Sequence, residues 1–139
     1  MKDNPNRFKY GRVFRSKLKN FEKSDIFLNA YFYVYGLKAV ENGKIKKQHI
    51  QSMFRLLRKL YKKTINFRFN VSLVVPVTDK PREARMGKGK AKRDHWECPV
   101  KKGTIILELS SFNFWKIRKG LVLLKEKLPL ETKIIKVTY

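Results

Sequence analysis

One short stretch of the chain carries the residue types that bind a phosphate backbone. Residues 80–93 hold seven Lys or Arg side chains, and Gly87 and Gly89 alternate there with Lys88 and Lys90. Glycine lets main-chain amides approach a phosphate, and lysine supplies the charge. Because the stretch has few apolar side chains to offset the entropy of ordering it, it predicts an anionic partner.

Other interpretations fit this loop less well. A nucleotide-binding P-loop needs a glycine five residues before Gly87 and a Ser or Thr after the Gly-Lys pair, where this chain has Gly89. A solvated charge run would cost stability without a partner. An acidic membrane surface would need an exposed apolar helix face, whereas the apolar stripe of residues 45–63 is needed for a core.

The overall charge also points to a polyanion. The chain has 139 residues, with 34 Lys or Arg against 11 Asp or Glu, for a formal net charge of +23. Eight cations lie in residues 1–25 and eight in residues 44–63, which contain no acid. These segments and the loop form three contact zones. If about eight cations met phosphates, log affinity would fall with log salt at a slope near −7.

No catalytic or metal-binding constellation is evident, and we expect no cofactor. His95 and Cys98 lie three residues apart on an expected strand, so they point to opposite faces, and His49 is the only other histidine. The carboxylates are scattered and are interpreted as local charge balance. The lone Cys98 excludes an internal disulfide, and we expect a soluble, intracellular chain without a membrane segment or removable targeting signal.

The first half of the chain predicts an arm, two strands and a helix. Residues 1–25 alternate basic and aromatic side chains without a regular period, which is typical of an arm that becomes ordered on its partner. A strand over 27–40, with a bulge or close approach at Gly36, leads to an Asn42-Gly43 turn. A helix over 45–63 and a half-buried strand over 65–75 follow.

The second half predicts a hairpin, a helix and a final strand. Pro76 should end the preceding strand, and residues 95–100 and 104–109 should pair as the hairpin. A helix over 114–127 and a strand over 132–138 complete an α+β sandwich of mixed or antiparallel sheet under two helices. Residues 26–139 then form one domain behind the arm. Trp96 and Trp115 are expected in the core, with base stacking as the alternative.

Several motifs occur in a recognisable order. They are Gly36–Ala39, Thr78–Pro81, Arg85–Lys90, Trp96 and Lys127–Pro129. From about Gly36 to Lys136 the chain resembles the bacterial-type L-sixteen family of large-subunit ribosomal proteins. The Arg-Met-Gly-Lys-Gly-Lys string is its most specific part. Ala91 and Glu131 depart from the family pattern, which usually has a glycine and a basic residue at these places.

The resemblance implies a structural, non-enzymatic protein that binds large-subunit rRNA near the A-site tRNA and the peptidyl transferase region. Its expected partners are other large-subunit proteins, and no homo-oligomer is expected. Lys, Phe, Ile, Asn and Tyr are frequent while Ala and Gly are scarce, a bias expected from an A·T-rich coding sequence. This favours a mitochondrial ribosome, with a plastid or bacterial one as the alternative. The rival functions are a free-standing RNA-processing or RNA-modifying protein and a DNA-compacting protein. The residues expected to contact rRNA or tRNA are Arg7, Lys9, Arg12, Arg15, Lys17, Lys46, Lys47, Arg55, Arg58, Lys59, Arg82, Arg85, Met86, Gly87, Lys88, Gly89, Lys90, Lys92 and Arg93.

Overall fold

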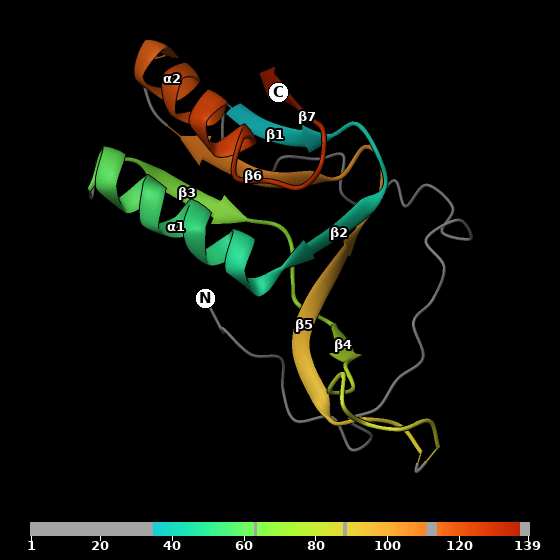
Figure 1. Ribbon diagram of the computed structural model, residues 1–139. Coiled ribbons are helices and arrows are strands. Elements are labelled where there is room, and N and C mark those ends of the chain that lie inside the picture. The colour runs from blue at the N-terminus through green and yellow to red at the C-terminus, as the bar shows by residue number, and fades with distance from the viewer. Residues whose placement is uncertain (1–34, 63, 88, 111–113, 137–139) are drawn as a thin grey trace.

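The chain has the expected α+β architecture (Figure 1). The computed structural model describes residues 35–62, 64–87, 89–110 and 114–136, so the arm and most of the strand expected over 27–40 lie outside the described residues. The elements are β1 (Tyr35–Ala39), β2 (Gly43–Lys46), α1 (Lys47–Tyr61), β3 (Asn66–Phe69), β4 (Val75–Thr78), β5 (Arg93–Val100), β6 (Ile105–Ser110), α2 (Phe114–Lys125) and β7 (Thr132–Lys136).

The strands form two antiparallel sheets. One sheet has the order β3-β6-β1-β7 and the other the order β2-β5-β4. The prediction that residues 95–100 and 104–109 pair as a hairpin was wrong, because β5 pairs with β2 and β4 while β6 pairs with β1 and β3. The turn at Lys101–Thr104 is therefore a corner between the sheets and not the end of a hairpin.

Two long segments connect the sheets. Residues 35–46 run antiparallel to residues 93–110, and both segments pass from one sheet to the other near Ala39 and Gly103. At this corner Ala39 N–H donates to Thr104 O at 2.9 Å, and Gly103 N–H donates to Ala39 O at 2.9 Å. Figure 1 shows β4 and β5 extending from this corner away from both helices.

The region around Gly36 confirms a close approach in β1. A Cβ at Gly36 would lie 3.1 Å from Leu107 O on the paired strand β6. The register of this pair shifts between Leu37 and Lys38, so the irregularity lies one residue beyond the glycine. Gly36 therefore lets β6 pass close to the backbone of β1.

The alternating segment over 65–75 does not form one strand. Its expected inward residues, such as Ile65 and Val71, are buried, but β3 ends at Phe69 and β4 begins at Val75 in the other sheet. Pro76 lies inside β4 instead of ending a strand. It is tolerated because β4 is the edge of its sheet, where a missing N–H need not break a ladder bond.

Helix α1 begins two residues later than predicted. Ile45 belongs to β2, where it lies opposite Cys98. Lys46 is the residue before the helix, and its N–H donates to His49 Nδ1 at 3.2 Å, which satisfies a backbone group at the helix start. Burial of His49, together with the nearby Lys46 charge, lowers the pKa of the imidazole.

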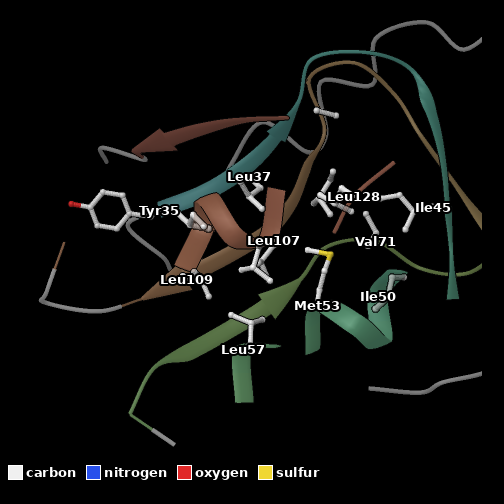
Figure 2. Packing of buried hydrophobic residues seen from close by; sticks show 14 of the residues in the cluster. Tyr35, Leu37, Ile45, Ile50, Met53, Leu57, Val71, Leu107, Leu109 and Leu128 are labelled. Carbon is white, nitrogen blue, oxygen red and sulfur yellow. The ribbon is translucent and has the colours of Figure 1, made fainter. Parts of the chain in front are cut away.

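The core lies between the β3-β6-β1-β7 sheet and the two helices (Figure 2). The α1 stripe contributes Ile50, Met53, Leu57 and Tyr61, as the spacing predicted, although Leu60 remains exposed. Figure 2 shows Leu37, Leu107 and Leu109 from the sheet facing Met53 and Leu57. Each such fully buried aliphatic side chain stabilises the fold by about 1.5–3 kcal/mol.

Helix α2 and the residues after it bury Leu121, Leu124 and Leu128, as their near-helical spacing predicted, but not Trp115. Ile117, Leu121 and Leu124 are buried, but Trp115 is 73% exposed, so its expected place in the core was wrong. Trp115 precedes Leu121 by six positions, which on a helix turns its side chain away from the buried face. The prediction for Trp96 is confirmed, because that residue is buried on β5.

Two carboxylates are not the surface charge balance that the sequence predicted. Glu97 and Glu108 are buried on β5 and β6. Glu108 lies on an inner strand of the four-stranded sheet, between Gly36 and Arg68 on its neighbours, and accepts a hydrogen bond from Asn70 Nδ2. The amide supplies a partner that a buried carboxylate needs.

Candidate nucleic-acid interface

The basic loop connects two paired strands. β4 and β5 are antiparallel, with Val75 opposite Glu97 and Thr78 opposite Arg93, and the connection over residues 79–92 extends beyond the end of this pair. Figure 1 shows the loop at the end of β5 that is farthest from the helices. The loop is therefore held at both ends by sheet hydrogen bonds while its middle stands clear of the core.

Most side chains of the loop are exposed. Met86 is 101% exposed, so an apolar side chain stands at the loop tip without burial. Lys80 Nζ donates across the loop to Gly87 O at 2.9 Å, and Ala84 N–H donates to Pro81 O at 3.0 Å. The exposed residues predicted to bind are Arg82, Arg85, Met86, Gly87, Gly89, Lys92 and Arg93, Lys90 is half-buried, and Lys88 lies outside the described residues.

The backbone conformation of the loop favours glycine at two positions. Gly87 has a φ of 99° and Gly89 a φ of 73°, which side chains with a Cβ rarely adopt. A Cβ at either position would meet no atom within 4 Å, so space is not the constraint. Ala91 is not among the residues with positive φ, so alanine fits there without backbone strain.

The base of the loop carries an ordered cation. Arg93 is the first residue of β5, and its guanidinium carbon lies 4.8 Å from the centre of the Trp96 ring. Such stacking restricts the guanidinium while leaving its N–H donors available to an acceptor. The buried Trp96 thus positions a basic group at the base of the loop.

Asp94, His95 and Glu97, next to Arg93, form a small charged network. The sequence interpretation treated His95 as an ordinary strand residue and missed this network. His95 Nδ1 lies 2.6 Å from Asp94 Oδ2, and His95 Nε2 lies 3.0 Å from Glu97 Oε1. The hydrogen bond to Asp94 raises the pKa of His95, and burial opposes part of this effect. The i, i+2 spacing of His95 and Glu97 on a strand was the available signal, because it places both side chains on one face.

The protonated imidazolium can donate to both carboxylates at once. Lys44 Nζ lies 3.9 Å from Glu97 Oε2, on the neighbouring strand. The hydrogen bonds of the network lie within β5, and this long ion pair is its link to β2. Among the described residues, no group of three or more His, Cys, Asp or Glu side chains could hold a metal ion.

Helix α1 presents a second basic surface. Arg55, Arg58 and Lys59 are exposed on the face opposite the core, and the Arg58 guanidinium carbon lies 4.3 Å from the centre of the Phe54 ring. Lys47 is half-buried, and the exposed Lys46 belongs to β2, so it is not part of the helix face as predicted. The structure does not bring this surface together with the loop, since Figure 1 shows α1 at the left, beside β3, and the loop at the lower end of β5.

The third predicted zone is the arm with Arg7, Lys9, Arg12, Arg15 and Lys17, and it lies outside the described residues. Within the described part of the chain, neither helix is long and apolar enough to cross a membrane.

Comparison with known proteins assigns this arrangement to a family. Residues 3–135 match the family model described as ribosomal protein L16p/L10e. The chain belongs to this family. It is 34% identical over 131 residues to the large ribosomal subunit protein uL16 of Xanthobacter autotrophicus, and equally similar to those of Azorhizobium caulinodans and Maricaulis maris. Each match covers 94% of this chain and 94% of the relative.

Membership in the L16p/L10e family makes this chain a ribosomal structural protein and not an enzyme. The rival interpretation as an RNA-processing or RNA-modifying enzyme is therefore wrong. The resemblance noted in the motifs is confirmed over nearly the whole chain.

Proposed function

We propose that this chain is a constituent of the large ribosomal subunit that binds large-subunit rRNA through the loop over residues 79–92. The observation that carries the proposal is the combination of a rigid base and a projecting, exposed tip. Gly87 and Gly89 leave main-chain amides accessible beside the cations, which suits a phosphate backbone. The names of the relatives, large ribosomal subunit protein uL16, support the same subunit.

The loop tip is proposed to reach toward the A-site tRNA. Met86 has the greatest exposure among the exposed large apolar residues, and Arg85 lies directly before it. In an rRNA crevice a tip of this kind can approach a second RNA, while the cations nearer the strands neutralise rRNA phosphates. The basic face of α1 and the arm over residues 1–25 are proposed as separate rRNA contacts, with residues 26–139 as the domain that positions them.

We propose that the chain is located in the mitochondrial ribosome, on the basis of its Lys-, Ile- and Phe-rich composition. The relatives named above are bacterial proteins, which also suits a bacterial or plastid ribosome. Cell fractionation followed by sedimentation separates these cases: the proposal expects the chain in large subunits from purified mitochondria, and recovery from another compartment contradicts it.

The salt dependence of rRNA binding tests the loop. The variant Arg82→Gln, Arg85→Gln, Lys92→Gln removes three exposed loop cations, and the control Lys125→Gln, Lys127→Gln, Lys133→Gln removes three exposed cations elsewhere. Loss of three phosphate contacts should make the log-log salt slope shallower by about 2 for the loop variant. The control should keep the parent slope, and equal changes in both variants would contradict the proposal.

The DNA-compacting alternative is tested in the same measurement. Structured rRNA and duplex DNA are offered as competitors at equal phosphate concentration. The proposal expects rRNA to displace labelled rRNA at a lower concentration than duplex DNA does, because rRNA offers crevices and unpaired nucleotides. Equal competition would favour binding that depends on charge alone.

A further inference from the structure

Exposed apolar side chains gather on one face of the protein, remote from the basic loop. The described residues include five exposed large apolar side chains, and Leu60 (42%), Trp115 (73%) and Val122 (46%) lie together at α2 and the last turn of α1. Scattered apolar residues are normal on a surface, but a contiguous group indicates an interaction site. The α2 face is defined here as Leu60, Trp115, Arg118, Lys119, Val122 and Leu123.

The α2 face carries two shallow, open depressions. Two adjoining depressions, each of about 450 Å³, share Lys119 and Leu123 in their walls. One reaches across to Leu60 on α1, and the other is bordered by Trp115 and Val122. Together they form a groove that runs along α2 and over the end of α1.

A glycine gives the groove its shape. Gly120 is buried where α2 crosses α1, and a Cβ there would lie 1.7 Å from Tyr61 Oη. The Tyr61 hydroxyl donates to Lys116 O at 2.7 Å, which fixes the two helices against each other. The hydrogen bond holds α1 and α2 together beneath the depression that Tyr61 and Gly120 line, and such preorganisation lowers the entropy cost of binding.

The borders of the groove are cationic. Lys116, Arg118 and Lys119 line the two depressions, and none of the described residues that line them is acidic. Cations alone would suit RNA, but the aliphatic groups of Leu60, Val122 and Leu123 offer little to a phosphate or a sugar. A protein segment with an apolar ridge and acidic flanks matches both the floor and the borders, and Trp and Arg are typical anchors of such interfaces.

We propose that the α2 face docks an amphipathic, acidic-flanked segment of a neighbouring ribosomal protein. This inference rests on membership in the ribosomal family and on the groove, and it does not depend on the rRNA contacts of the loop. It gives the chain two surfaces of different chemistry, one for nucleic acid and one for protein.

Site-specific photocrosslinking in assembled subunits tests the proposal. A benzophenone amino acid replaces Val122, and sedimentation verifies that the variant is incorporated in large subunits. We expect an adduct with a protein segment that carries apolar residues at helical spacing and flanking Asp or Glu. An adduct only with rRNA, an adduct with a second copy of this chain, or no adduct in subunits that contain the variant would overturn the proposal.

A binding measurement then tests the residues. The crosslinked segment is made as a synthetic peptide, and its affinity for the free protein is measured by fluorescence anisotropy. Trp115→Ala should weaken binding at least about 10-fold, as for a central aromatic anchor, and Arg118→Glu should weaken it through charge repulsion. Val74→Ala is the matched control, because Val74 is 48% exposed outside this face. Equal affinity of Trp115→Ala and the parent would overturn the proposal.

Discussion

The contact between Gly120 and Tyr61 predicts a large effect from the smallest possible side-chain addition. In Gly120→Ala the new Cβ would lie 1.7 Å from Tyr61 Oη and 2.6 Å from Tyr61 Cζ, so the ring must move. Movement breaks the 2.7 Å hydrogen bond to Lys116 O, at about 1 kcal/mol, and overpacking adds about 1–3 kcal/mol. The higher helix propensity of alanine returns about 1 kcal/mol, so the net loss is about 1–3 kcal/mol.

Urea unfolding followed by fluorescence measures this loss, with the buried Trp96 as the reporter. Arg118→Ala is the control on the exposed side of the same helix, and we expect a change within about 0.5 kcal/mol. In a double-mutant cycle, Tyr61→Leu should absorb most of the cost of Gly120→Ala, because the ring that the Cβ meets is gone. A stabilising effect of Gly120→Ala in the parent chain would refute the reasoning.

Three further outcomes are expected. His95 has a raised pKa in the folded chain, so its contribution to the free energy of unfolding is complete below the ordinary pKa of 6.5 and is lost as pH rises through the higher folded pKa. Urea unfolding across pH 5–9 should show this loss in the parent chain but not in His95→Gln, and an unchanged profile in the variant would contradict it. Burial raises the pKa of the Cys98 thiol to about 11, so a thiol reagent at pH 8 should label Cys98 only when the fold opens, and rapid labelling of the folded chain would contradict this. Gly87→Ala should weaken rRNA binding, because the positive φ of Gly87 disfavours alanine and the loop backbone must change, while the free energy of unfolding should fall by no more than about 1 kcal/mol, because no atom crowds a Cβ there. Unaltered binding would count against a role of the loop backbone.

Periodicity predicted the helices because their buried residues repeat at three and four positions. Ile50, Met53 and Leu57 follow this rule, and the structure buries all three. The prediction that Trp115 is buried was wrong for a related reason. Ile117 points into the core from α2, and a helical residue two positions earlier points outward. The exposed surface that results was therefore invisible until the helix phase was known.

Strand pairing could not be predicted from local pattern. The Gly103 turn between two apolar segments is typical of a hairpin, but nothing in it specifies whether the flanking strands pair with each other or with distant ones. The decisive partners are β1 and β2, more than fifty residues earlier in the chain. The same limitation hid Glu108, which is buried because β6 is an inner strand.

The loop was easier to predict than its support. Its charge and glycines are local properties of the sequence, so its exposure could be expected. The stacking of Arg93 on Trp96 and the bonds of His95 depend on side-chain directions along β5, and these required the structure. Sequence thus indicated the binding chemistry, while the structure identified how the loop base is held.

The central claim, that the loop lies in large-subunit rRNA near the A-site tRNA, is tested most directly by crosslinking from the loop tip. A benzophenone amino acid replaces Met86, and large subunits that contain the variant are isolated, irradiated and mapped by primer extension. We predict adducts with large-subunit rRNA nucleotides at the A site, and with tRNA when the A site is filled. Adducts confined to proteins, or absence of the chain from large subunits at low salt, would contradict the claim.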